Sequence, residues 1–410
     1  MSNSFSVIVV LAWRNLWRNY RRTLILLVTI ALGVWSMIFM TALMRGMVDE
    51  IVRNGLATLP GEVQIHAPAY RDDPSIVHRI PMPSGDLLAA LGQPPIVGWS
   101  ARIRVPAVIA SERDSRGVTL LGVDPLAEQR LGSAPHAIVE GRFLTDENDK
   151  GVVIGASMAR RLETRLGKRI VLMSQDPNND VADRGARVVG IYTARLPGTE
   201  DRFVYSGRSV IQSMLGIEGE VSEIAITAGD YRAVAQWYPA IAAAGGAQFE
   251  VLPWTELDSY LSTMLNVQDG FALVFMIVVF LALSFGLVNT LVMSVFERVR
   301  EIGLMQALGM RPKLILAQVL LESVYLLLVG LAMGNIIAFA TIKSLEDGID
   351  ISGVAQGMEQ MSMSPVLYPA LRIEDMVMST MVVIVLGLLA SLLPAWKASQ
   401  LDPVVALAKT

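Results

Sequence analysis

Four charged residues, Glu297, Arg298, Arg300 and Glu301, fall within five positions between two of the most apolar stretches of the chain. Carboxylates and guanidinium groups at this spacing form ion pairs on a helix surface and dock onto charged partners. One interpretation is an inside-facing loop whose arginines fix the membrane topology. The other is a lever, which inserts into a groove on a cytoplasmic protein and pushes the attached membrane span when that protein moves.

The local sequence predicts a short amphipathic helix that continues rigidly from a membrane span. Helical propensity is good from Val295 to Leu308, and Gly309 followed by Pro312 predicts its end. The helix would have two distinct faces. One face carries Glu297, Arg300, Glu301, Leu304 and Leu308, and a neighbouring face carries Arg298, Ile302 and Met305.

No set of residues with the pattern of a catalytic site is found. The G-x-x-x-x-G-K-[ST] pattern of a nucleotide-binding P-loop is missing from the sequence, and "GASMA" (155–159) lacks the final glycine of a nucleophile elbow. Cysteine is absent and the three histidines lie far apart, so we expect no metal site. The net charge of −4 argues against nucleic-acid binding. We predict a chain that is not an enzyme and binds no cofactor itself.

Four apolar runs are long enough to cross a bilayer, which takes about 20 helical residues. The composition is 53% hydrophobic, and the mean hydropathy is +0.48. The predicted spans are residues 23–45, 270–295, 314–342 and 376–396. The first span follows a basic start, but it is longer than a signal-peptide core and is followed by no clear cleavage site, so we predict that it is retained.

Basic residues set the orientation of the spans. Arginines crowd before the first span and between the second and third spans, whereas the loop before the fourth span is mainly acidic. We therefore predict cytoplasmic segments at 1–22, 296–313 and 397–410, and extracytoplasmic segments at 46–269 and 343–375. The fold class is an α-helical membrane protein with four transmembrane helices and a large α+β domain inserted between helices 1 and 2.

The large domain shows short Val- and Ile-rich strand patterns bounded by turn residues. Helices are expected at 157–167, ending on Gly167, and at 231–246. Because strands and helices do not alternate regularly, we expect an α+β fold in two subdomains. The predicted strands are 61–67, 102–110, 117–123, 151–155, 168–174, 186–194 and 221–227.

Several polar, small or aromatic residues mark the membrane segments. Trp13 and Trp17, with Arg14 and Arg18 one position on, predict an amphipathic helix in the headgroup plane, which either anchors the first span or transmits force to it. Glu322, inside the third span, is interpreted as a structural partner of Asn289 or a neighbouring helix, with a relay or gating role as the alternative. The spacing of Gly330 and Gly334 favours close approach of another helix.

The segment 296–310, "FERVREIGLMQALGM", closely resembles the E-R-x-R-E-I-G-x-x-x-A-x-G signature of FtsX-like permeases, the membrane subunits of type VII ABC transporters. The stretch "PAWKASQLDPVVAL" (394–407), the "AWRNLWRNYRRT" start and "IVEGRFLTD" (138–146) are also similar to that family. The signature matches at Glu297, Arg298, Arg300, Glu301, Ile302, Gly303, Ala307 and Gly309, and the tail at Pro394, Ala395, Ala398, Pro403, Ala406 and Leu407.

The resemblance implies a mechanotransmission machine in the bacterial inner membrane, with both termini cytoplasmic and the large domain periplasmic. Two permease chains, identical or related, would pair within membrane lipid. Each would be served by a cytoplasmic ABC ATPase subunit, two copies in all, which binds ATP and Mg and grips the 296–309 coupling helix. Whether a periplasmic or outer-membrane partner takes part stays open, as does the role of the Met-rich loop 357–369.

Within the family, the layout looks most like that of lipoprotein-releasing permeases, which implies extraction of lipoprotein or lipid cargo. Macrolide- or peptide-type export is the alternative, and a membrane receptor that binds its ligand with 46–269 is an interpretation from a different class. The candidate cargo groove near the first two spans comprises Met40, Leu43, Met44, Met47, Leu261, Met264, Leu265, Phe271 and Phe275.

Overall fold

The computed structural model describes residues 2–58, 61–133, 135, 137–194, 199–308, 310–350 and 366–400. These residues form two compact units. The helical unit contains the described residues of 1–48, 265–350 and 366–410, and the β-rich unit contains those of 49–264.

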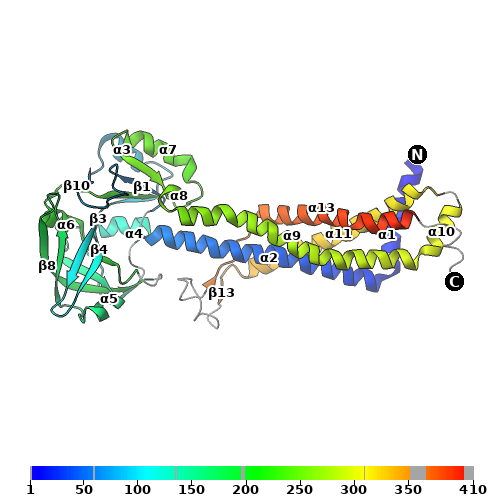
Figure 1. The fold of residues 1–410 in the computed structure, drawn as a ribbon, viewed down its shortest axis with the longest axis horizontal. Helices are drawn as coiled ribbons and strands as arrows, with labels where there is room; N and C mark the ends of the chain where they lie inside the picture. Colours follow the sequence, from blue (N-terminus) through cyan, green and yellow to red (C-terminus); the bar gives the residue numbers. More distant parts are fainter. Residues whose placement is uncertain are drawn as a thin grey trace. The chain divides into compact units, whose positions relative to one another are not determined.

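The helical unit is built around four long apolar helices (Figure 1), which confirm the predicted fold class of a multi-pass membrane protein. They are α2 (Tyr20–Thr58), α9 (Ser259–Glu297), α11 (Pro312–Ser344) and α13 (Ile373–Ser399). Both α2 and α9 run beyond the predicted spans, into residues that the sequence assigned to the large domain. The remaining elements are α1 (Ser2–Arg18), α10 (Val299–Ala307) and the hairpin of β13 (Ile349–Asp350) and β14 (Val366–Leu367).

Glycines let the long helices pack closely. A Cβ added at Gly330 of α11 would lie 2.5 Å from Ile30 of α2, and one at Gly334 would lie 2.6 Å from Val34. Real Cβ atoms essentially never approach other heavy atoms this closely, so α2 can lie against α11 only because these positions carry no side chain. Gly330 and Gly334 therefore lie at a helix–helix contact, as their spacing predicted.

The four long helices differ in how much apolar surface the chain itself covers. Half of the most apolar 18-residue window is buried in α2 and in α11, against 22% in α9 and α13. The uncovered side of α9 carries large apolar side chains such as Phe271, Val278 and Phe285. Within the described part of the chain, α2 and α11 are thus the inner helices of the bundle.

The β-rich unit contains one sheet of ten strands. Nine follow the order β12-β1-β11-β3-β4-β9-β6-β8-β5, and β7 pairs with β3 and β8. The strands of this sheet are β1 (Val63–His66), β3 (Gly98–Ala110), β4 (Ser115–Val123), β5 (Ala137–Gly141), β6 (Gly151–Gly155), β7 (Arg169–Gln175), β8 (Val181–Thr193), β9 (Phe203–Gly207), β11 (Glu223–Thr227) and β12 (Glu250–Pro253). The helices are α3 (Gly85–Leu91), α4 (Pro125–Leu131), α5 (Ala156–Arg161), α6 (Arg208–Leu215), α7 (Val234–Gly245) and α8 (Trp254–Leu257), and a small ladder joins β2 (Ile80–Pro81) to β10 (Glu220–Val221).

The long strand β3 connects two halves of this sheet. Its residues 98–102 pair with β11, and its residues 103–110 pair with β4. Each of the seven predicted strands corresponds to an observed one, whereas β5, β9 and β12 were not predicted. The helix expected at 157–167 is wrong in length. It ends at Arg161, because Glu163 has a positive φ of 47° and the Gly167 N–H donates to the Val188 carbonyl instead of closing a helix.

Candidate functional site at the α10 end of the helix bundle

The predicted coupling helix is separated from α9 by a turn. Helix α9 ends at Glu297, Arg298 adopts φ −113° and ψ 13°, and α10 begins at Val299. The prediction of one rigid, continuous helix is therefore wrong. The Arg298 side chain contacts both α11 and α1, and these contacts hold the turn.

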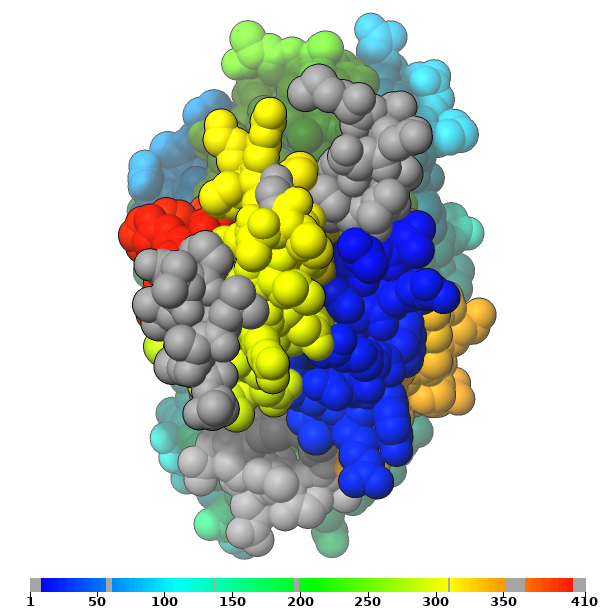
Figure 2. All heavy atoms as spheres, turned by 90° about the vertical axis from the view of Figure 1, so that its right-hand side faces the viewer, coloured from blue at the N-terminus to red at the C-terminus, as the bar shows by residue number. Residues whose placement is uncertain are grey.

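Helix α10 has the two faces that its sequence predicted. Val299 and Ile302 are buried on one side, together with Gly303. On the other side Leu304 is 53% exposed and Leu308 is 81% exposed. Figure 2 shows this end of the bundle, with α10 beside α1 on the surface. The exposed leucines form an apolar patch for which the described part of the chain provides no cover.

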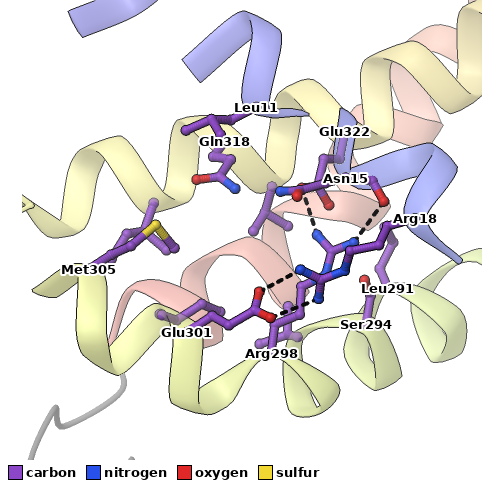
Figure 3. A pocket seen from close by; sticks show the side chains of 14 residues that line it. Leu11, Asn15, Arg18, Leu291, Ser294, Arg298, Glu301, Met305, Gln318 and Glu322 are labelled. Carbon is purple, nitrogen blue, oxygen red and sulfur yellow. Dashed lines mark hydrogen bonds and ion pairs between the residues drawn. The ribbon is translucent and has the colours of Figure 1, made fainter. Parts of the chain in front are cut away.

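A buried ion pair at this end links the turn between α9 and α10 to α11, and Asn15 of α1 binds both partners. The Arg298 Nη1 donates to Glu322 Oε1 at 3.0 Å, and the Asn15 Nδ2 donates to the same oxygen at 2.9 Å. The Arg298 Nη2 donates to the Asn15 carbonyl at 2.8 Å. The ion-paired side chains are only 9% and 8% exposed. We call Asn15, Arg298 and Glu322 the Arg298 cluster (Figure 3).

Glu322 is therefore paired, but not with the residue that the sequence suggested. Asn289 is exposed on α9, and its side chain makes no hydrogen bond with any described residue. It lies on a different face of α9 from Leu287 and Leu291, which are 4% and 3% exposed and pack in the bundle core. The expected Glu322–Asn289 contact is wrong, and Glu322 instead contacts Arg298 and Asn15 on neighbouring segments.

The two glutamates of the coupling segment make exposed ion pairs within the chain. Arg18 of α1 lies 2.9 Å from Glu301, and Arg22 at the start of α2 lies 2.8 Å from Glu297. Surface pairs of this kind stabilise a fold by about 0–1 kcal/mol. Of the four charged side chains, only that of Arg300, which is exposed, forms no hydrogen bond or ion pair within the described residues. Three of the four charges at 297–301 thus fix the α9–α10 corner against α1, α2 and α11.

A cavity of about 230 Å³ lies behind α10, between α1, α9 and α11 (Figure 3). Seven of its fourteen lining residues are apolar, and the charged groups that reach it are those of the ion pairs just described. The lining side chains are Leu11, Asn15, Arg18, Leu291, Ser294, Val295, Arg298, Glu301, Ile302, Met305, Ile315, Gln318, Val319 and Glu322.

Helix α1 carries its tryptophans against a neighbouring helix as well as toward the outside. The rings of Trp13 and Trp17 meet edge to face at 5.9 Å, and Trp13 contacts Tyr325 of α11 at 5.4 Å. Both tryptophans remain nearly half exposed, at 44% and 47%. Arg14 is exposed, whereas Arg18 binds Glu301. The predicted aromatic face thus anchors α1 to α11.

The predicted cargo-groove residues differ widely in exposure. Met40 is 43% exposed and Phe271 is 63% exposed. In contrast, Leu261 is 5% exposed and packs on Gly55, so its side chain is not open to a cargo. The half-buried members are Leu43, Met44, Met47, Met264, Leu265 and Phe275. Leu261 and Met264 belong to the β-rich unit and the others to the helical unit.

Three predictions fall wholly or partly outside the described residues. Gly309, the last signature residue, is one of them, and most of the Met-rich loop is another. The tail positions Pro403, Ala406 and Leu407 also lie outside, whereas Ala395 and Ala398 are fully buried in the cluster that includes Ile302 and Ile315.

Sequence reasoning missed a second buried charge cluster at the opposite end of the bundle. Arg45 of α2 lies 2.5 Å from Asp375 of α13 and 2.7 Å from Asp269 of α9. The Arg45 and Asp375 side chains are 4% and 2% exposed, but Asp269 is 64% exposed. A signal was available, because each residue stands at the same end of an apolar run, and opposite charges at one membrane depth tend to pair.

The β-rich unit buries a charge pair of its own. Arg102 of β3 lies 2.7 Å from Glu128 of α4, and both side chains are at most 2% exposed. Burial raises the pKa of Glu128, but Arg102 and hydrogen bonds from Ser100 and Ser133 outweigh it and lower that pKa overall. Every partner of this glutamate is thus already bound within the core, as in a structural ion pair rather than a reactive one.

The family-like stretch 138–146 leads into a loop held by one carboxylate. Arg142 donates to Asp149 at 2.5 Å, and the backbone N–H groups of Thr145 and Gly151 donate to the same side chain. Burial raises the pKa of Asp149, but these hydrogen bonds outweigh it and bring the pKa down from 3.8 to about 2. The ionised carboxylate therefore stabilises the loop.

Two family models cover most of the chain. Residues 23–244 match the MacB-like periplasmic core domain, and residues 273–403 match the FtsX-like permease C-terminal model. The second match includes the whole α10 region and the Arg298–Glu322 ion pair.

Individual relatives are similar along much of the chain. A permease of an ABC transporter from Methanocaldococcus jannaschii is 26% identical, covering 65% of this chain and 64% of its own. The macrolide export ATP-binding/permease protein MacB of Wolinella succinogenes is 24% identical over 97% of this chain and 60% of its own. The chain thus spans less than two thirds of either relative. The lipoprotein-releasing system transmembrane protein LolE of Haemophilus influenzae is 23% identical, over 91% of both chains.

Proposed function

Because the chain belongs to the family of permeases with a MacB-like periplasmic core domain and an FtsX-like C-terminal part, we propose that it is the membrane subunit of an ABC transporter that works by mechanotransmission. The sequence lacks a P-loop, so in this proposal ATP and Mg are bound by a partner ATPase. The β-rich unit then acts on cargo outside the membrane.

The observation that carries the proposal is the exposed face of α10. Leu304 and Leu308 are 53% and 81% exposed, and Arg300 beside them has no partner within the described residues. An apolar patch next to an unpaired cation is suited to a groove with apolar walls and an acidic rim. The opposite face of α10 is fixed by the Arg298 cluster. A push on the exposed face is therefore passed to α11 and α1 instead of bending the helix.

The proposed orientation puts α10 and α1 on the cytoplasmic side of the inner membrane and the β-rich unit in the periplasm. The excess of arginines before the first span and between the second and third supports this topology. A pair of permease chains, identical or related, would be served by two ATPase subunits. The largely uncovered α9 and α13 supply apolar surface for lipid or for the second permease chain.

For the cargo, we keep lipoprotein or lipid as the proposal and macrolide-type efflux as its alternative. LolE supports the first and MacB the second, at 23% and 24% identity. Reconstituted transporter should hydrolyse ATP faster with a triacylated lipopeptide than with erythromycin. Stimulation by erythromycin alone would replace the proposal by its alternative.

The α10 interface is tested by Leu308→Asp in the full chain, co-expressed with its ATPase and purified in nanodiscs. We expect the ATPase to be lost on washing and coupled ATP hydrolysis to fall at least tenfold, because a carboxylate must be desolvated in an apolar groove. Leu166→Asp, at a 39% exposed leucine of the β-rich unit, is the matched control and should retain both.

Full retention of the ATPase and of coupled hydrolysis by Leu308→Asp would contradict the lever, whereas failure of the unmodified chain to retain any ATPase would favour the receptor alternative. Charge reversal at Glu301 is a less specific test of this interface, since it also breaks the ion pair with Arg18.

A further inference from the structure

A hollow of about 320 Å³ lies between two surface segments of the β-rich unit. One is the turn that joins β3 to β4, and the other is the segment 163–169, which leads from α5 into β7. Every residue that lines the hollow is polar or charged, and four cationic and two acidic side chains are among them. We call this site, with its surplus of two positive charges, the basic hollow.

The acids of the basic hollow do not neutralise its cations. Glu163 pairs with Arg113, and this pair joins the two walls. One acid, Glu112, is then left against three exposed cations that form no ion pair with any described residue, namely Arg165, Lys168 and Arg169. The hollow therefore favours an anion.

A further cation stands directly opposite Arg169 in the sheet. Arg169 of β7 and Arg187 of β8 are partners in the antiparallel ladder, so their side chains share one face of the sheet. Like charges at directly opposite positions destabilise a sheet. The Arg187 Nη1 donates to the Gly167 carbonyl at 2.9 Å, and its side chain forms no ion pair within the described residues. No described acid thus relieves this repulsion, whereas a bound anion would.

The walls and cations of the basic hollow are held by the backbone around them. The Ser111 Oγ donates to the Leu162 carbonyl at 2.7 Å and so ties the two walls together. The guanidinium of Arg169 lies over Gly185 of β8, since a Cβ built at Gly185 would be 2.8 Å from its Nη2 and 2.9 Å from its Nε. The missing side chain at this position leaves the space that the guanidinium occupies.

We propose that the basic hollow binds a phosphate monoester group. Guanidinium groups present paired donors that match phosphate oxygens, and a lysine ammonium adds a compact positive charge. A phosphate monoester carries a charge of about −1.5 to −2 near pH 7, which balances the surplus of two positive charges. The volume of the hollow also falls in the range of roughly 300–1,000 Å³ that is typical of ligand pockets.

The carrier of this group is either a soluble phosphorylated molecule or a lipid headgroup, because both present the same oxygens. The site uses no residue of α10. It therefore does not depend on the proposed function.

The probe is 4-fluorophenyl phosphate, added to the full chain in phosphatidylcholine nanodiscs and followed by fluorine NMR against empty nanodiscs. One exposed ion pair contributes little, so saturable binding requires several of these cations to act together. We expect such binding, and binding of the monoanion 4-fluorobenzenesulfonate that is at least about fivefold weaker, the factor for one net hydrogen bond.

Two variants test the role of Arg169. Arg169→Met should weaken binding of the phosphate about fivefold. Arg71→Met is the matched control and should leave binding unchanged, because Arg71 is an exposed arginine of the same unit that does not line the hollow. Gly185→Val should also weaken binding, although it removes no charge, because its side chain takes the space of the Arg169 guanidinium.

Sucrose-loaded vesicles of phosphatidylcholine, with or without phosphatidic acid, identify the carrier. Sedimentation of the nanodiscs with the phosphatidic acid vesicles alone, and its loss in Arg169→Met, would assign the group to a lipid headgroup. Binding of 4-fluorophenyl phosphate without such sedimentation would assign it to a soluble molecule. The proposal is overturned if the phosphate does not bind saturably, if the sulfonate binds as tightly, or if Arg71→Met weakens binding as much as Arg169→Met. It is also overturned if neither Arg169→Met nor Gly185→Val changes binding.

Discussion

Replacing Arg298 by methionine removes the only described cation that contacts Glu322, and it leaves a carboxylate with 8% exposure inside the bundle. At the observed N–O distance of 3.0 Å, the attraction between the two charges is about 5 kcal/mol for an effective dielectric constant near 20. Part of that attraction only offsets the desolvation of the two ions. We expect either Arg298→Met or Glu322→Met to lower the free energy of unfolding by about 3–5 kcal/mol.

The double variant Arg298→Met/Glu322→Met separates the ion pair from general damage. With both charges gone, the main loss is the unpaired amide of Asn15, which costs about 1–3 kcal/mol. The two single losses would sum to about 6–10 kcal/mol if they were independent. The predicted coupling is therefore at least about 3 kcal/mol, which is a large value for neighbouring residues.

The free energies are measured by titrating SDS into mixed micelles of the full chain and following tryptophan fluorescence. Arg300→Met is the matched control, because the side chain of this exposed arginine, two positions further on in α10, has no partner among the described residues and should change stability by less than about 0.5 kcal/mol. A double variant as unstable as the sum of the singles would refute the reasoning, since the two residues would then act independently.

Three further predictions concern other parts of the chain. Gly334→Val should prevent α11 from packing on α2 and lower the SDS concentration at the unfolding midpoint. Gly286→Ala is the control and should leave that midpoint unchanged, because a Cβ at this position meets nothing within 4 Å. Equal effects of the two substitutions would contradict the close contact. Asp375→Asn should cost more unfolding free energy than Asp269→Asn, because the first carboxylate is 2% exposed and the second 64%; the reverse order would be inconsistent with the cluster at that end. The folded-state pKa of Asp149 is about 2, below its ordinary 3.8, so its contribution is present above about pH 4 and is lost as the pH falls through 2. The melting temperatures of wild type and Asp149→Asn should thus differ most near neutral pH and become similar near pH 2. A difference that does not change with pH would contradict the lowered pKa of Asp149.

The four spans were predictable from the sequence because the signal is local. Each run supplies about 20 apolar residues without help from the rest of the chain. The start of α9 at Ser259 was not predictable, since only five of the eleven residues at 259–269 are apolar, and these residues continue the helix only in the context of their neighbours. In the same way, the α10 pattern predicted its two faces but not the turn at Arg298, which depends on contacts with α1 and α11.

The partner of Glu322 shows where sequence reasoning stops. A carboxylate within a span signals a partner, but the pattern does not identify it. Asn289 was a reasonable candidate by depth and lies on the wrong face of its helix. The signature motif predicts that Arg298 contacts an external partner, but its side chain is ion-paired with Glu322 of the same chain. Which polar side chains pair between two helices depends on how each helix is rotated about its own axis. The sequence of a largely apolar helix gives little information about that rotation.

The Arg45 cluster also has a consequence for biogenesis. Of the four long helices described, α2, which carries Arg45, is synthesised first, and α13, which carries its most buried partner Asp375, is synthesised last. An arginine in the middle of an inserting helix costs about 2.5–3.5 kcal/mol, and a position near the helix end reduces this cost by letting the guanidinium reach the interface. Until the final span is made, this arginine must therefore stay at the water boundary. The guanidinium of Arg45 becomes buried only when α13 completes the bundle. A nascent chain that stops before α13 therefore leaves this charge exposed, as a feature for membrane quality control to recognise.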